Sequence, residues 1–212
     1  MKLRKFGLLI TLVIVAMACK KKYKNPDPAP EEFVYTSSGK VNNQDVAFLS
    51  GVNGYYPSTL FYTEDNVVSY KFGIKTANTS EDYFEFFVAD VAAGPDSNDV
   101  NDLLNAVANK SYVLGEDNAN PITYSFSYFR NGVQYAPKKG QSGNIVLSNQ
   151  KDLGEIKAID HKTGEEYMSR YVQFNGKLEN VTLYNAADEA LLITKFEFLG
   201  KLAAAGDLRK KK

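Results

Sequence analysis

The ten residues Val67-Val-Ser-Tyr-Lys-Phe-Gly-Ile-Lys-Thr76 decide the fold class of this chain. Large apolar side chains fall on every second position, at Val68, Tyr70, Phe72 and Ile74, and the positions between them are polar or small. A period of two residues is that of a β-strand with one face against a core and the other in water. We therefore predict a half-buried strand here.

The segments around this strand carry the same kind of signal. Tyr83 to Val91 is apolar on both faces, which predicts a strand in the middle of a sheet. Asn42-Asn43 and Asn131-Gly132 are residue pairs that favour tight hairpin turns. Short strands with turn signals about every 8 to 12 residues are typical of antiparallel sandwiches and barrels. We predict an all-β domain with about ten to twelve strands, either a sandwich or a barrel of the lipocalin-like kind. Residues 143–148, 154–160, 167–178 and 181–184 are expected to be separate strands among them.

One short helix is the exception to this pattern. Its apolar residues have the helical spacing i, i+3, i+4 and i+7, at Val100, Leu103, Leu104 and Val107. The loop before it offers Asp96, Asn98 and Asp99 as oxygen ligands for calcium, although the glycine and glutamate of an EF-hand loop are missing. Capping of the helix, by Ser97 or Asp99, explains the same polar residues.

The N-terminus has the features of an export signal. A basic leader precedes an apolar run of 13 residues, Phe6 to Ala18. As a helix this run would reach roughly 20 Å, which is short of the roughly 30 Å hydrocarbon core of a bilayer. We therefore interpret residues 1–18 as a signal peptide and not as a membrane span.

The run ends at Ala16-Met17-Ala18-Cys19, which resembles the lipobox of bacterial lipoproteins. The resemblance implies that the Cys19 sulfur carries a diacylglycerol and that Cys19 becomes the first mature residue. The alternative is an ordinary signal peptide that is cut after Ala18 and leaves a free thiol. Because Cys19 is the only cysteine, it cannot form an internal disulfide.

Residues 19–32 are expected to form a lipidated tether and a proline-rich spacer. Lys20, Lys21 and Lys22 follow the cysteine, where surface-exported lipoproteins of the Bacteroidetes typically have acidic residues. We therefore expect a lipid-anchored protein of the bacterial cell envelope, at the outer membrane and facing the periplasm, with membrane lipid as its first partner.

The charge distribution excludes one class of partner. The whole chain has a formal net charge of zero, but residues 25–208 hold 14 Lys and Arg against 25 Asp and Glu, a net charge of −11. An acidic body repels a phosphate backbone, so we do not expect nucleic-acid binding. Residues 33–200 are long enough for one β-rich domain, and residues 201–212 are expected to be a basic tail.

Several segments together resemble small envelope lipoproteins of the Bacteroidetes whose function is uncharacterised. Besides the lipobox and spacer, the resemblance rests on Ser38-Gly39-Lys40-Val41-Asn42, Lys110-Ser-Tyr-Val-Leu114, Gly143-Asn-Ile-Val-Leu147, Phe174-Asn-Gly-Lys-Leu178 and Lys195-Phe-Glu-Phe198. It covers most of the chain as a pattern of spacing. It implies a β-rich lipoprotein domain and supplies no catalytic residues.

A catalytic constellation is not evident in the sequence. The only histidine, His161, lies between Asp160 and Lys162 in an expected turn, and no nucleophile motif accompanies it. One cysteine and one histidine cannot form a zinc tetrad. We therefore expect no catalytic residue and no cofactor.

The leading hypothesis is a non-catalytic envelope protein that binds a small ligand or an envelope partner. A cavity lined by Phe and Tyr would be one binding surface, and Tyr55 and Tyr56 in an expected loop over residues 50–58 would be another, unless they only pack locally. The alternative is a structural or assembly lipoprotein that acts only through a protein interface, which a filled interior and an exposed apolar patch would favour. A hydrolase is the remote alternative.

Overall fold

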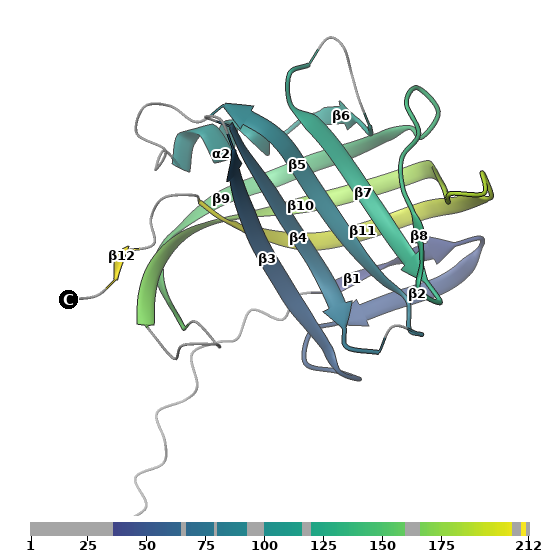
Figure 1. The fold of residues 1–212 in the computed structure, drawn as a ribbon, viewed down its shortest axis with the longest axis horizontal. Helices are drawn as coiled ribbons and strands as arrows, with labels where there is room; N and C mark the ends of the chain where they lie inside the picture. Colours follow the sequence, from purple (N-terminus) through teal and green to yellow (C-terminus); the bar gives the residue numbers. More distant parts are fainter. Residues whose placement is uncertain are drawn as a thin grey trace, which may run out of the picture. The chain divides into compact units, whose positions relative to one another are not determined.

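Two antiparallel sheets and one short helix make up the described part of the chain (Figure 1). The computed structural model describes residues 36–64, 67–78, 80–92, 100–115, 120–159, 166–204 and 209–210, all within one compact unit, Val34–Lys212. These residues form twelve strands. The predicted all-β class with one short helix is confirmed, and of the two predicted architectures the structure has the sandwich.

The smaller sheet has five strands in the order β3-β4-β5-β7-β8. Their bounds are β3 (Tyr55–Glu64), β4 (Val67–Thr76), β5 (Tyr83–Ala92), β7 (Thr123–Arg130) and β8 (Val133–Tyr135). β4 has the predicted bounds, and its predicted apolar face is buried. β5 is the central strand, as predicted. Asn131 and Gly132 have φ angles of 50° and 75° and form the predicted turn between β7 and β8.

The larger sheet has seven strands, six of them in the order β2-β1-β11-β10-β9-β6. Their bounds are β2 (Gln44–Leu49), β1 (Thr36–Val41), β11 (Ala190–Ala203), β10 (Glu166–Tyr184), β9 (Asn144–Ile159) and β6 (Ser111–Val113), and β12 (Arg209–Lys210) pairs with β10. β1 therefore lies between its hairpin partner β2 and β11. Asn42 and Asn43, with φ angles of 48° and 65°, form the predicted turn between β1 and β2.

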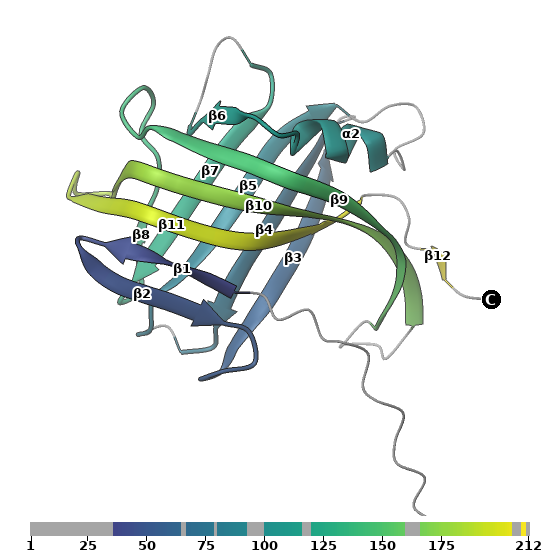
Figure 2. The same ribbon diagram turned by 180° about the vertical axis from the view of Figure 1, so that it is seen from behind.

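The sheets face each other with their strands crossing at a steep angle, as Figures 1 and 2 show. Isolated bridges join them: Ala136, after β8, pairs with Tyr184 at the end of β10. Helix α2 (Val100–Ala106) contacts β5 of one sheet and β9 and β10 of the other. The Tyr124 hydroxyl donates a hydrogen bond of 2.7 Å to the Ala106 carbonyl and so satisfies one orphan carbonyl of the helix C-terminus.

Phenylalanine rings fill the space between the sheets. Eight are at most 3% exposed: Phe48, Phe72, Phe84, Phe86, Phe126, Phe174, Phe196 and Phe198. Phe84 shows how they interlock, because its ring centroid lies 5.3 Å from those of both Phe196 and Phe198 in the opposite sheet. Aromatic pairs at such distances add stability beyond their buried area. The interior is therefore occupied by side chains along this row.

Glycines on the larger sheet make room for these rings. In the β10–β11 register Phe174 is opposite Gly200 and Gly176 is opposite Phe198, so the two pairs have reversed orientation. A Cβ atom at Gly176 would lie 2.2 Å from the Phe198 ring, and one at Gly200 would lie 2.4 Å from the Phe174 ring. Each ring thus lies over the glycine of the neighbouring strand.

The expected loop over residues 50–58 is wrong from Tyr55 onward: residues 50–54 form turns, and Tyr55 and Tyr56 begin strand β3. Their backbones pair with β4, where Tyr55 is opposite Thr76. Pro57, which suggested a loop, is tolerated because β3 is an edge strand and the missing N–H can face away from the ladder.

The strands predicted separately over residues 143–148 and 154–160 form one strand, β9, and those over 167–178 and 181–184 form β10. The residues that suggested turns are irregularities within the ladder. Asn149 and Gly154 have φ angles of 54° and 73°, and the β9–β10 register shifts beside both of them. β11 also runs to Ala203, so residues 201–203 belong to the sandwich and not to the tail.

Candidate functional site

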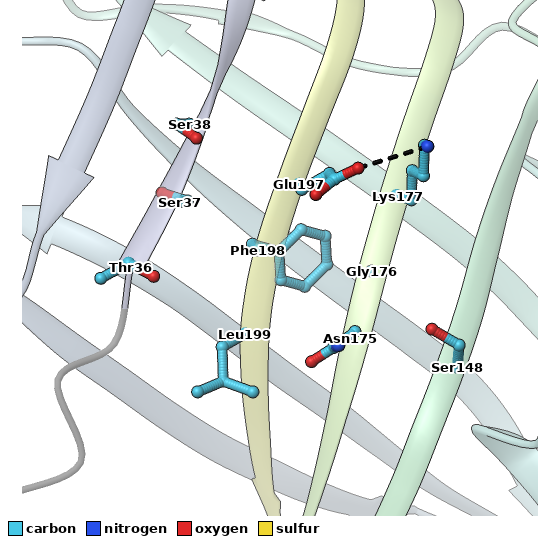
Figure 3. A pocket seen from close by; sticks show the side chains of 10 residues that line it. All are labelled: Thr36, Ser37, Ser38, Ser148, Asn175, Gly176, Lys177, Glu197, Phe198 and Leu199. Atoms are coloured by element: carbon cyan, nitrogen blue, oxygen red, sulfur yellow. Dashed lines mark ion pairs between the residues drawn. The ribbon is translucent and has the colours of Figure 1, made fainter.

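The outer face of the seven-stranded sheet carries a polar groove, a hollow of about 310 Å³ (Figure 3). It crosses β1, β11, β10 and β9. Its lining residues are Thr36, Ser37, Ser38, Ser148, Asn175, Gly176, Lys177, Glu197, Phe198 and Leu199. The volume is at the lower end of the range for ligand pockets, about 300–1,000 Å³.

Strand register brings these residues together from distant parts of the chain. Glu197 of β11 is opposite Ser38 of β1 on one side and opposite Lys177 of β10 on the other. Asn175 of β10 is likewise opposite Ser148 of β9. Because side chains alternate between the faces of a strand, these residues point outward, away from the aromatic core.

Lys177 carries the positive charge of the groove. Its Nζ lies 2.7 Å from Glu179 Oε1 and 3.3 Å from Glu197 Oε1. Hydrogen bonds to Glu179 and, as a smaller effect, to Glu197 raise the pKa of Lys177 above its usual value, so its ammonium stays charged at neutral pH. Among the lining residues Lys177 and Glu197 thus offset each other's charge, while Glu179, which is closer to Lys177, is not part of the lining.

The floor of the groove is closed by the core. Gly176 carries no side chain there, and the Phe198 ring lies beneath it. Ser37 is 3% exposed, and its Oγ is shielded from solvent and has no hydrogen-bond partner among the residues that the structure describes. The polar groups that can reach a ligand are therefore the hydroxyls of Thr36, Ser38 and Ser148, the amide of Asn175 and the charged pair above.

Such a lining suits non-covalent recognition. Hydroxyl and amide groups both donate and accept hydrogen bonds, ammonium only donates and carboxylate only accepts. Among the described residues no group of three or more His, Cys, Asp or Glu side chains is placed to hold a metal ion.

The two tyrosines proposed as ligand contacts are separated by the structure. Tyr55 faces the core, where its ring lies 5.4 Å from that of Phe48 and its hydroxyl donates a 2.9 Å hydrogen bond to the Asp82 carbonyl. Burial, followed by the charges of Glu81 and Asp82, raises the pKa of Tyr55. Tyr56 points the other way and is 47% exposed. Successive residues of one strand cannot line one site on the same face.

Tyr56 belongs to a second surface, the outer face of the five-stranded sheet. Leu60 and Tyr62 of the same strand are 46% and 51% exposed. On the same face Glu85 of β5 forms two ion pairs, one with Lys75 (Nζ to Oε1, 2.7 Å) and one with Lys71 (Nζ to Oε2, 3.3 Å). This surface combines exposed apolar side chains with paired charges.

The other residues proposed from the sequence lie outside the described residues. They are Cys19, the calcium candidates Asp96, Asn98 and Asp99, and the lone His161.

Sequence reasoning missed the groove, although a signal for it existed. The segments 38–42, 143–147, 174–178 and 195–198, which carry the resemblance to envelope lipoproteins, fall on the neighbouring strands β1, β9, β10 and β11. Their inward residues include the Gly176–Phe198 pair, and four of their outward residues, Ser38, Asn175, Lys177 and Glu197, line the groove. Only the pairing of strands reveals this grouping.

Comparison of the chain with family models, with curated proteins and with solved structures finds no match. Within the described ranges no helix has the length and hydropathy needed to cross a membrane.

Proposed function

We propose that this chain is a non-catalytic, lipid-anchored binding protein of the bacterial cell envelope, and that the groove on the seven-stranded sheet binds a small, uncharged, hydroxyl-rich ligand. The observation that carries the proposal is the lining of the groove, which combines hydroxyl and amide groups with one ion pair, Lys177 with Glu197. A neutral polyol can donate to the carboxylate and accept from the ammonium without burying a net charge.

Lipidation of Cys19 supplies the location in this proposal. Acyl chains contribute about 0.8 kcal/mol for each buried methylene, and two or more chains anchor a protein stably. Cys19→Ser should therefore move the protein from the detergent-rich phase to the aqueous phase in a phase-partition assay. Retention of the variant in the detergent-rich phase would refute the anchor.

Native mass spectrometry of the full chain, purified in detergent from its own host, tests ligand binding. We expect an adduct of defined mass that is lost on unfolding. The adduct should also be lost in Asn175→Ala and Glu197→Ala, whose side chains line the groove, and retained in the control Tyr56→Ala on the other sheet. A chain without an adduct, or an adduct that survives both groove substitutions, would contradict the proposal.

The exposed row of Tyr56, Leu60 and Tyr62 favours a second candidate function, a protein interface. The interior filled by phenylalanine rings agrees with this candidate, because a protein interface needs no internal ligand cavity. Crosslinking in intact membranes tests this candidate: a specific crosslinked partner should disappear in Leu60→Asp and persist in Asn175→Ala.

A further inference from the structure

A second hollow adjoins the groove on the same outer face. It measures about 430 Å³ and lies over β2, β1 and β11. Ser38 lines both hollows, so they meet at this residue. Together they cross five neighbouring strands, β2-β1-β11-β10-β9, a width of about 19 Å at about 4.8 Å per strand spacing.

An irregularity in β11 explains why the sheet is hollow here. Lys195 has a φ angle of 49°, and beside it the β1–β11 register shifts between the pairs Ser38 with Glu197 and Lys40 with Thr194. A β-bulge of this kind bends its strand and redirects side chains. The residues at the centre, Ser38, Gly39 and Ala47, are small, so the floor stays low between longer side chains.

The second hollow repeats the chemistry of the first. Lys40 Nζ lies 2.8 Å from Asp45 Oδ1, and both residues line it. Each hollow therefore has one lysine–carboxylate pair at its rim, and Ser38 lies between the two pairs. A charged ligand would be repelled by one member of each pair, whereas a hydroxyl group can donate to the carboxylate and accept from the ammonium of either pair.

The direction of the groove argues against a peptide. A peptide that adds to a sheet pairs with the free backbone groups of an edge strand. The groove instead crosses β1, β11 and β10, whose backbones are already paired on both sides. A ligand in this groove would therefore be recognised by side chains and not by backbone pairing, and a ligand that fills both hollows would reach both ion pairs.

We infer that the two hollows form one binding groove for an extended, uncharged oligosaccharide. The inference rests on the proposed function, because it names the ligand class of the same groove. Sugar hydroxyls would bridge the Lys177–Glu197 pair at one end and the Lys40–Asp45 pair at the other, with Ser38 contacting the middle of the chain. A single sugar ring would occupy one hollow only.

Isothermal titration calorimetry on the full chain, in a detergent without a sugar head group, tests this inference. The probes are β-1,4-linked oligomers of one to six units, of glucose and of N-acetylglucosamine. For one of the two series we expect affinity to rise at least tenfold from one unit to four and then to level off. Asp45→Ala should reduce the affinity for the tetramer to near that for the single unit and leave the latter unchanged.

Matched variants separate this inference from the proposed function. Asn175→Ala should weaken the binding of every oligomer, and Leu60→Ala on the other sheet should weaken none. If single units bind but added length and Asp45→Ala have no effect, the extended groove is wrong while the proposed function stands. If no oligomer of either series binds, the oligosaccharide assignment is overturned, and the adduct in native mass spectrometry decides the proposed function separately.

Discussion

The reversed Gly–Phe pairs predict that a single methyl group at Gly176 will destabilise the sandwich. The added Cβ atom would lie 2.2 Å from Cζ and 2.3 Å from Cε1 of Phe198. Carbon atoms in contact are about 3.5–4.0 Å apart, so the ring would have to move by about 1.5 Å. It cannot do so freely, because five other phenylalanine rings lie within 6.1 Å of its centroid.

The magnitude follows from two opposing terms. Overpacking of a core costs about 1–3 kcal/mol, and the surrounding rings place this site towards the upper end. Alanine lowers the conformational entropy of the unfolded chain relative to glycine, which stabilises the folded state by about 0.4–1 kcal/mol. We therefore expect Gly176→Ala to lower the free energy of unfolding by about 2 kcal/mol, or the melting temperature by about 4–8 °C.

Urea denaturation, followed by circular dichroism, measures this change, and a double-mutant cycle tests its cause. Phe198→Leu replaces the ring by a smaller side chain, so in that background Gly176→Ala should lower the free energy of unfolding by about 1–3 kcal/mol less. Gly154→Ala is the control: its φ angle is 73° and no atom lies within 4 Å of the added Cβ, so it should cost about 1 kcal/mol through backbone strain alone and show no coupling to Phe198→Leu. An unchanged urea midpoint for Gly176→Ala, or zero coupling, would refute the reasoning.

Three further predictions concern polar groups. Ser37→Ala should raise the free energy of unfolding by up to about 1 kcal/mol because the buried Ser37 Oγ has no partner among the described residues. Ser142→Ala loses the 2.7 Å hydrogen bond from the Lys138 N–H and should lower the free energy of unfolding by about 1 kcal/mol. Urea midpoints of the two variants that shift in the same direction would contradict this contrast. Burial, with the hydrogen bond to Asp82, raises the pKa of Tyr128, so its stabilisation is complete below about pH 10 and is lost as the pH rises further; Tyr128→Phe should flatten the alkaline part of a stability–pH curve. A hydrogen bond from Arg170 lowers the pKa of Asp152, so its stabilisation is present above about pH 4 and is lost as the pH falls; Asp152→Asn should remove an acid-dependent contribution of less than about 1 kcal/mol.

Local patterns predicted the elements that depend on neighbouring residues. The alternation along residues 67–76 defines β4, and Asn42-Asn43 and Asn131-Gly132 have the positive φ angles that hairpin turns require. Where bulges interrupt long strands, the same reasoning failed. Glycine and polar residues in β9 suggested chain reversal, but the pairing along β10 keeps the strand continuous through Gly154.

The groove could not be predicted because its residues meet only through strand pairing. Ser38 and Glu197 are far apart in the chain and become neighbours when β1 pairs with β11. A register shifted by one residue would turn these side chains into the core. Sequence alone does not fix that register. The expected Tyr55–Tyr56 surface failed for the same physical reason, since adjacent residues in a strand face opposite sides.

The position of β1 also affects how the chain reaches its native state. β1 and β2 can form their hairpin as soon as both exist, but β1 finds its second partner only in β11, near the other end of the chain. The bond from the Leu192 N–H to Asn42 Oδ1 closes a loop of 150 residues. Contacts of such high contact order slow folding, because the entropy of closing the loop is lost before the contacts form. Until β11 pairs with it, β1 has an unpaired edge whose free N–H and C=O groups can pair with another chain, so slow pairing with β11 prolongs exposure to aggregation.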